Sequence, residues 1–403
     1  MTAVTVNATV TFPDGLPVGA TGPAGPAGPT GPQGIPGPTG PAGPSGSGVG
    51  SGYSQRLRVF RSEGKLPIFK KGSGNTIALR AGVEIEFLGV LYAPTADQTI
   101  TGPTLVPGTD YRVRINADGS MQYDAYSVAL PAGAEVMGGF HMLIGSPATG
   151  FGTGGGWTPT LLEWSIWDVG FRPKCDPRGM TRVNGAGFWV DIYFQGDSSN
   201  VDGVSRNNDT ILTGANPPVR PADYGGNGVA KFIVMNWWEV NEHLRQHGKR
   251  LPSYEEMCLA AFGTNESDGR GNHPIKTGFA TANSGTSSSD PNFTSQCGVI
   301  QSTGVLWIWT STLSYWPGTP TANSWGWEAY DNTGGRGKTI LPNTTGATSI
   351  LFGGNYLYRS DGGSQGATEV SGSRAMETIE TLWNNSANLG IRGACDHYSS
   401  SYR

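Results

Sequence analysis

The sequence predicts an α+β protein in which strands and loops predominate and a collagen-like, triple-helical stalk precedes the folded part of the chain. Three observations support this class. Glycine recurs at every third position between residues 19 and 46, apolar and charged residues alternate in short runs between residues 55 and 145, and two short capped helices lie between residues 236 and 263. A composition with 63 Gly, 28 Pro and only 14% charged residues, against about 25% in an average domain, agrees with many turns and few long helices.

Length and charge limit the domains and partners to expect. A chain of 403 residues is too long for one ordinary core, so two or three domains are expected. With a net charge of −4 and no run of Lys or Arg, no nucleic-acid partner is expected. No apolar run is long enough for membrane insertion. Residues 1–18 lack the basic start and apolar core of a secretory signal, so we expect a protein made in the cytoplasm or exported only as part of a particle.

The repeat at residues 19–48 predicts the oligomeric state. Strict Gly-X-Y spacing is typical of a collagen triple helix, because only glycine fits at the axis where three chains meet. A disordered Pro/Gly linker is the alternative, although composition alone would not keep the period. We therefore expect a homotrimer, preceded by an N-terminal attachment segment at residues 1–18. The glycines expected to hold the trimer are Gly22, Gly25, Gly28, Gly31, Gly34, Gly37, Gly40 and Gly43.

Residues 54–150 are expected to form a small antiparallel β-sandwich domain. Apolar and charged residues alternate at 83–87 and at 111–115, as they do in half-buried strands. Residues 116–119 have the composition of a tight turn, so the strand at 111–115 should pair with the one that follows it as a hairpin. The Gly/Thr/Ser-rich residues 146–156 are a linker or a loop.

The third region, residues 157–403, contains the clearest helices. Asn236 can cap a helix over residues 237–244, with Gly248 at its end. Ser253 and Glu256 have the spacing of a capping box and begin a second helix that continues to Gly263. The mostly apolar residues 304–309 predict a strand, and loops with short strands are expected beyond it.

The stretch from residue 352 to 397 has the composition of a binding surface. Aromatic side chains supply rigid contact area and amides supply adaptable hydrogen bonds. A solvated loop region with a few packing aromatics is the alternative, and these residues alone do not decide between the two. The side chains in question are Asn355, Tyr356, Tyr358, Ile379, Trp383, Asn384, Asn385 and Asn388.

Three further segments carry a family resemblance. They are Trp-Asp-Val-Gly-Phe-Arg-Pro at 167–173 with Asp-Pro-Arg-Gly-Met at 176–180, His-Gly-Lys-Arg-Leu-Pro at 247–252 with Ala-Phe-Gly-Thr at 261–264, and Asn-Thr-Gly-Gly-Arg-Gly at 332–337. Ser-Gly-Ser-Arg at 371–374 and Cys-Asp-His at 395–397 complete the pattern. From about residue 55 to its end, the chain resembles the phage major tropism determinants, trimeric receptor-binding proteins at the tips of tail fibres.

The resemblance implies a C-type-lectin-like, receptor-binding domain at 157–403, related in fold to the formylglycine-generating enzyme, and a β-sandwich before it. The N-terminus departs from the family pattern, which has a small β-prism where this chain has Gly-X-Y triplets; both devices hold a trimer. The resemblance also implies receptor contacts at variable positions within the last fifty residues. On this chain they are Asn355, Leu357, Glu377, Ile379, Glu380, Asn384, Ser386, Asn388 and Leu389.

No metal site or cofactor is expected. His243 and His247 are four residues apart on a predicted helix, as two zinc ligands can be. The glutamate of the HExxH pattern and a third ligand are missing, so an ordinary helix surface is preferred. The spacing of Cys175, Cys258, Cys297 and Cys395 suggests no pair like the active-site cysteines of the enzymes that share the fold, and reduced thiols are expected.

No catalytic residues are expected either. Glu377 with Glu380 is the carboxylate pair to watch for glycan cleavage. A solvent-exposed pair that contacts the receptor is preferred for these two residues.

The leading hypothesis is a non-catalytic, homotrimeric phage tail-fibre protein that binds a bacterial surface receptor, protein or glycan, and is carried on the virion. Its N-terminus is expected to attach to other tail-fibre or baseplate proteins. Two alternatives stay open. One is a fibre-borne depolymerase that cuts capsule or lipopolysaccharide, and the other is a structural fibre or baseplate part whose C-terminal domain binds another virion protein.

Overall fold

A computed structural model describes residues 56–61, 64–266, 268–279, 290–316, 327–328, 339–340, 346–356, 371–378 and 381–399. The attachment segment at 1–18 and the Gly-X-Y glycines lie outside the described residues, so the stalk and the trimer remain predictions. The chain divides into a unit of Met1–Ser47 and a unit of Gly48–Arg403, and every described residue belongs to the second. Within the described part, no helix is long and apolar enough to cross a membrane.

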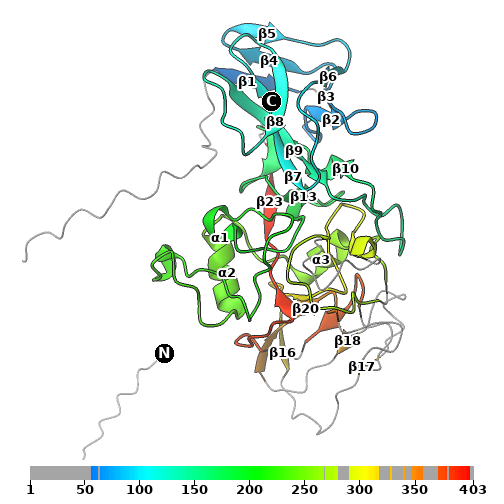
Figure 1. Cartoon of the computed structure of the whole chain (residues 1–403), viewed down its shortest axis with the longest axis vertical. Helices are drawn as coiled ribbons and strands as arrows, with labels where there is room; N and C mark the ends of the chain where they lie inside the picture. The colour runs from blue at the N-terminus through cyan, green and yellow to red at the C-terminus, as the bar shows by residue number, and fades with distance from the viewer. Residues whose placement is uncertain are drawn as a thin grey trace, which may run out of the picture. The chain divides into compact units, whose positions relative to one another are not determined.

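Antiparallel strands build the first part of the described chain (Figure 1). They are β1 (Leu57–Phe60), β2 (Phe69–Lys71), β3 (Ile77–Leu79), β4 (Glu84–Phe87), β5 (Val90–Tyr92), β6 (Gln98–Ile100), β7 (Thr109–Ile115), β8 (Met121–Ala125) and β9 (Glu135–Leu143). One sheet has the order β1-β4-β5, a second has the order β2-β3-β6, and β7 lies between β8 and β9. Side chains from all of them, such as Phe69, Ile85 and Val113, meet in one buried core.

The predicted hairpin of β7 and β8 is confirmed, with one difference in burial. Ile115 pairs with Met121, and the turn closes with a 2.8 Å bond from Asn116 N to Ser120 O. Arg112, expected on the solvated side of its strand, is buried. Its Nε donates to Asp124 Oδ1 at 2.6 Å, so the charge is paired. The alternation of apolar and charged residues therefore shows which side chains lie on the same face of the sheet, but not whether other parts of the chain bury that face.

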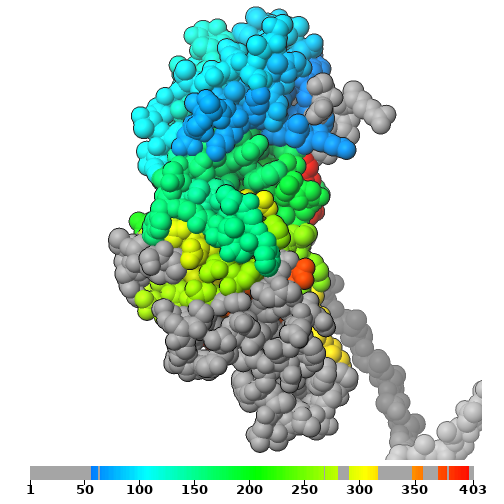
Figure 2. Space-filling model, turned by 90° about the vertical axis from the view of Figure 1, so that its right-hand side faces the viewer, coloured from blue at the N-terminus to red at the C-terminus, as the bar shows by residue number. Residues whose placement is uncertain are grey.

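The sheet that contains β7, β8 and β9 is larger and runs from this part into the rest of the chain. Its further strands are β10 (Thr160–Leu161), β11 (Trp167–Asp168), β12 (Phe171–Pro173), β13 (Met180–Arg182), β14 (Phe188–Asp191) and β23 (Ala394–Ser399). The order is β13-β14-β23-β12-β11-β9-β7-β8, with β10 paired to β9. Figure 2 shows the green surface of the residues after β9 directly against the cyan surface of the first strands. The sheet thus crosses from the predicted domain at 54–150 into the one at 157–403, and their boundary remains a prediction.

Glycine allows this sheet to form. A Cβ on Gly138 of β9 would lie 2.2 Å from the carbonyl oxygen of Trp167, so only glycine lets β11 approach. Residues 146–156, predicted as a linker or a loop, pack as a loop. Gly154 N donates to Gly263 O at 2.9 Å, and Gly155 N donates to Pro291 O at 3.0 Å.

Both predicted helices are confirmed, although the second ends at Ala260 and does not continue to Gly263. They are α2 (Trp237–Arg245), capped by Asn236 together with Glu239, and α3 (Tyr254–Ala260), capped by Ser253 together with Glu256. The other helical segments are α1 (Ser199–Asp202), η1 (Glu163–Ser165), η2 (Ala222–Tyr224) and η3 (Asp290–Phe293). In both long helices the cap side chain accepts from the backbone, and the glutamate three residues later accepts from the cap N–H.

Short strands build the last sheets. They are β15 (Trp307–Ile308), β16 (Leu313–Trp316), β17 (Trp327–Glu328), β18 (Thr339–Ile340), β19 (Gly346–Ser349), β20 (Leu351–Phe352), β21 (Met376–Glu377) and β22 (Leu389–Gly390). One sheet has the order β17-β18-β21-β20-β15-β22, and β16 pairs with β19. The strand predicted at 304–309 is present only as β15, although all six of those residues are buried. The apolar run therefore predicted correctly that these residues are buried, but it overestimated the length of the strand.

A buried ion pair connects the segment after α2 to the large sheet. Lys249 Nζ lies 2.5 Å from Asp191 Oδ1 and 2.6 Å from Gly203 O. The other carboxylate oxygen, Oδ2, accepts from Gly393 N and Gln195 Nε2, each at 2.5 Å. Burial alone would lower the pKa of Lys249, but the attraction of Asp191 and the hydrogen bond to it raise that pKa overall. The ammonium is therefore retained inside the fold.

The prediction that His243 and His247 lie on an ordinary helix surface is wrong for His243. This ring is fully buried, with Nε2 3.3 Å from Ser199 Oγ. Burial, and then His247 and Lys249, lower the pKa of His243 to about 3. Burial and Lys249 lower the pKa of His247 to about 4. His243 lies in the last turn of α2 and His247 lies just beyond the end of that helix, with the two ring centroids 5.6 Å apart. The sequence spacing does not show that both rings face the buried lysine. Among the described residues, no group of three or more His, Cys, Asp or Glu could hold a metal ion.

The cysteines are reduced thiols, but two of them are neighbours. Cys175 N donates to Cys395 Sγ at 3.1 Å, although the two lie 220 positions apart. Hydrogen bonding from Cys175 lowers the pKa of Cys395 to about 7, and the same contact with burial raises the pKa of Cys175. Spacing in the sequence did not predict this pair, because β12 and β23 meet only through the sheet.

Candidate functional site

The loop at residues 381–389 contains four of the nine predicted receptor contacts. Of the nine predicted receptor contacts, Leu357, Ile379 and Glu380 lie outside the described residues. Asn384, Ser386 and Asn388 are half-buried and follow one another along this loop. The structure therefore brings together three of the predicted residues on one short segment.

Three other predicted contacts are buried. Asn355 forms an isolated β-bridge with Val305, a core residue. Glu377 belongs to β21, and Leu389 is the first residue of β22. Burial of these side chains does not support direct contact with a receptor, so they are left out of the exposed face considered below. Position in the sequence does not tell which way a strand residue points. Here Glu377 pairs with Leu351 and Leu389 pairs with Trp307, and both side chains are buried.

Backbone hydrogen bonds anchor the loop at both ends. Leu382 O accepts from Trp237 N at 3.0 Å, at the start of α2, and Asn388 O accepts from Trp307 N at 2.9 Å, at β15. In the middle, Ser386 O accepts from Gly214 N at 3.0 Å. The loop is therefore held by three different segments of the chain, and its conformation does not depend on its own short contacts alone.

Side chains complete the anchoring. Asn385 Oδ1 accepts from Met235 N at 2.8 Å, and His273 Nε2 lies 3.1 Å from Ala387 O. Within the loop, Asn384 Oδ1 accepts from Asn385 N, and Ser386 Oγ accepts from Asn388 N. A loop fixed in this way loses little conformational entropy on binding, which favours a preorganised surface.

Two exposed tryptophans accompany the loop. Trp383 lies within it, and Trp238 lies in the first turn of α2, with the two rings stacked. Neither was among the predicted contacts, although Trp383 was noted for its composition. The sequence signal for Trp238 is the Trp237–Trp238 pair at a helix start, because two adjacent helical residues cannot both face the core.

A buried arginine supports the strand behind the loop. Arg392 donates from Nη1 to Asp191 O and Ile192 O, each at 3.1 Å, and from Nη2 to Gln301 O at 2.9 Å. Its guanidinium carbon lies 4.1 Å from the centroid of the Phe194 ring. The arginine thus ties the turn between β22 and β23 to two neighbouring backbone segments, at residues 191–192 and 300–301. The sequence pattern Gly-Ile-Arg-Gly marked this segment without predicting that its charge is buried.

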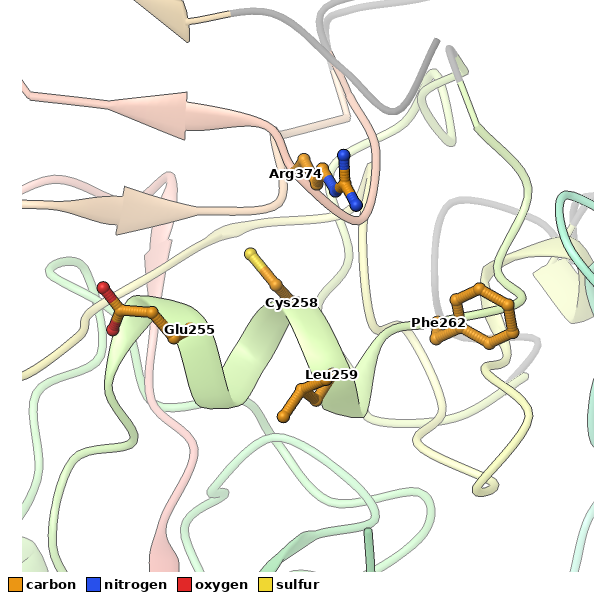
Figure 3. Close-up of a pocket in the computed structure, with 5 residues that line it drawn as sticks. All are labelled: Glu255, Cys258, Leu259, Phe262 and Arg374. Atoms are coloured by element: carbon orange, nitrogen blue, oxygen red, sulfur yellow. The ribbon is translucent and has the colours of Figure 1, made fainter. Parts of the chain in front are cut away.

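A separate hollow lies over α3 (Figure 3). Its volume is about 330 Å³, and it is lined by Glu255, Cys258, Leu259, Phe262 and Arg374. Cys258 points toward Arg374 across the hollow, whereas Leu259 projects from the opposite side of the helix. No histidine is among these lining residues, so they lack the Cys–His pairing that commonly activates a thiol nucleophile. The hollow therefore carries no catalytic assignment.

Comparison with known proteins identifies similar chains. No protein-family model matches the sequence. The tail fiber receptor-binding protein of Bordetella phage BPP-1 is 37% identical over 335 residues, which cover 82% of each chain. Among solved structures, the M1 variant of a major tropism determinant has a TM-score of 0.71 at 36% identity, and the I1 variant has a TM-score of 0.71 at 37% identity. Each comparison covers 85% of this chain and 86% of the other. The mostly β architecture with few helices is thus shared with these structures.

Proposed function

Because the chain belongs to the family of the phage major tropism determinants, the tail-fibre receptor-binding proteins, we propose that it is a receptor-binding protein of a phage tail fibre. It binds a receptor on the surface of the bacterial host, and so it decides which cells the phage adsorbs to. The observation that carries this proposal is similarity to a receptor-binding protein over most of both chains, in sequence and in fold.

The proposed receptor face is the loop at residues 381–389, with Asn384, Ser386 and Asn388 as contact residues. Their partial exposure and the anchoring of the loop support this assignment. Leu357, Ile379 and Glu380 are assigned to the same face by their place in the sequence. Asn355, Glu377 and Leu389 are buried and are therefore left out of the proposed contact residues.

The finer architecture is also a proposal. Residues 157–403 are assigned a C-type-lectin-like fold, and the Gly-X-Y repeat at 19–48 is assigned a triple helix that makes the protein a homotrimer. The N-terminal segment attaches the trimer to other tail-fibre or baseplate proteins of the virion. Three linked faces raise the effective concentration at the cell surface, so a modest affinity per face suffices for firm adsorption.

Binding without catalysis is the activity proposed. The relatives are named for receptor binding and tropism. Measuring released reducing sugar after incubation of the purified protein with host capsule or lipopolysaccharide checks this directly, and none is expected.

Competition with the phage tests the proposed function. Host cells are incubated with increasing concentrations of the purified full-length protein, and the rate of phage adsorption is then measured. We expect a saturable block, because soluble protein and virion occupy the same receptors. Unchanged adsorption at concentrations at which the protein is soluble and folded would favour a structural part that binds another virion protein instead.

A further inference from the structure

Two tryptophans from distant parts of the chain form an exposed aromatic platform beside the anchored loop. The ring centroids of Trp238 and Trp383 are 6.4 Å apart, and their planes differ by 7°. The residues are 44% and 63% exposed. Trp237, by contrast, turns its ring inward, and its Nε1 donates to Thr310 O at 2.9 Å. Tryptophan is usually highly buried, so a parallel pair held in water requires a reason.

The separation of the two rings is fixed by the backbone. Leu382, next to Trp383, accepts a hydrogen bond from the N–H of Trp237, next to Trp238. Two residues further along the loop, Asn385 accepts from Met235 N, just before the cap of α2. The platform is therefore preorganised, and a ligand that stacks on it does not have to order it.

The loop that meets the platform carries no charge, and the acidic residues nearest to Trp238 along α2 are Glu239 and Glu242. Residues 213–218, 232–238 and 381–389 contain no Asp, Glu, Lys, Arg or His. The polar groups that they offer beside the rings are amides and a hydroxyl, from Asn384, Asn385 and Ser386. Anionic ligands are recognised by Arg and Lys, and protein partners are commonly held by arginine together with tryptophan and tyrosine. An aromatic and amide surface without Arg or Lys in the adjoining loop fits a neutral, hydroxyl-rich ligand better than either of these.

A neutral sugar ring has this chemistry. One face of a hexose presents C–H groups, which are attracted to the negative face of an aromatic ring, and its hydroxyls both donate to and accept from amides. We propose that Trp238 and Trp383 form a stacking platform for a neutral sugar unit of a glycan on the host surface. This inference rests on the proposed function, because it assigns a ligand class to the same receptor face.

Binding of the purified full-length protein to host cells tests the proposal. Cells are used intact, after mild periodate oxidation, which opens the vicinal diols of sugars, and after protease treatment. We expect periodate to abolish binding and protease treatment to leave it unchanged. We also expect Trp383→Ala to weaken binding to intact cells by about tenfold or more, equivalent to about 1.4 kcal/mol, and Trp383→Phe to retain most of it.

Trp157→Ala is the matched control, because Trp157 is 50% exposed and lies outside the loop. It should bind as wild type does. Binding that survives periodate and is lost after protease treatment would overturn the sugar assignment and leave the receptor-binding function standing, with a protein as the receptor. Wild-type binding by both Trp383→Ala and Trp238→Ala would show that the two tryptophans do not contact the receptor. Absence of binding to intact cells would contradict the proposed function itself.

Discussion

Replacing Lys249 with methionine leaves the Asp191 carboxylate buried without the ammonium group that lies 2.5 Å from it. Gly393 N and Gln195 Nε2 continue to donate to this carboxylate, but neither carries a charge. Removing one partner of a buried ion pair costs about 3–5 kcal/mol, because the remaining charge is uncompensated. With an unfolding entropy of about 2.1 cal/mol/K per residue, a unit of roughly 350 residues should melt about 4–7 °C lower.

The double variant Asp191→Asn with Lys249→Met provides the control. Asparagine can keep its oxygen toward Gly393 N and place its amide on the side that faced Lys249, so much of the lost stability should return. Thermal unfolding followed by tryptophan fluorescence at pH 7, at one protein concentration, measures both variants. A single variant that melts within about 1 °C of wild type, or a double variant no more stable than the single, would refute the reasoning from the buried pair.

Other predictions concern acid stability and the helix that holds the loop. The folded-state pKa values of His243 and His247 lie near 3 and 4, below an unfolded value of about 6.5, so the unfolded chain takes up protons that the folded chain does not. Stability should be intact above pH 6.5 and fall as the pH drops toward 4, by about 2 kcal/mol per histidine at pH 5. Urea unfolding at pH 5, 6 and 7 should show a shallower fall for His243→Gln than for wild type, and equal slopes would contradict the burial argument. Asn236→Ala removes the cap of α2 and should cost about 1 kcal/mol, measured by urea unfolding at pH 7. Trp237 N also donates a hydrogen bond to Leu382 O of the loop. Hydrogen exchange of the backbone amides at the N-terminus of α2 should therefore be faster in this variant. An unchanged exchange rate would show that the cap does not stabilise the N-terminus of α2.

Local features of this protein were predictable and long-range ones were not. The caps at Asn236 and Ser253 and the turn after β7 depend on residues within four positions of one another, and each is present as predicted. The contact of Cys175 with Cys395 and the stacking of Trp238 on Trp383 depend on how β23 and the loop pack, which no local pattern contains.

The burial of the predicted receptor-contact residues was likewise not predictable from local sequence patterns. The resemblance placed the predicted receptor contacts within one stretch of the chain, but it could not separate half-buried Asn384 from buried Glu377. Strands of two residues, such as β21 and β22, have too few positions to show an alternation. Which of their side chains turn inward is decided by pairing with β20 and β15.

The most direct test of the receptor face is equilibrium binding to host cells by a variant in which Asn384, Ser386 and Asn388 are all replaced by alanine. A matched triple variant at Gln98, Thr99 and Gln122, exposed polar positions of β6 and β8, serves as the control. Thermal unfolding of both variants checks that each is folded before binding is measured. We predict that the loop variant loses affinity by about a hundredfold or more while the control binds normally. Normal binding by the folded loop variant would contradict the assignment of residues 381–389 as the face that meets the receptor.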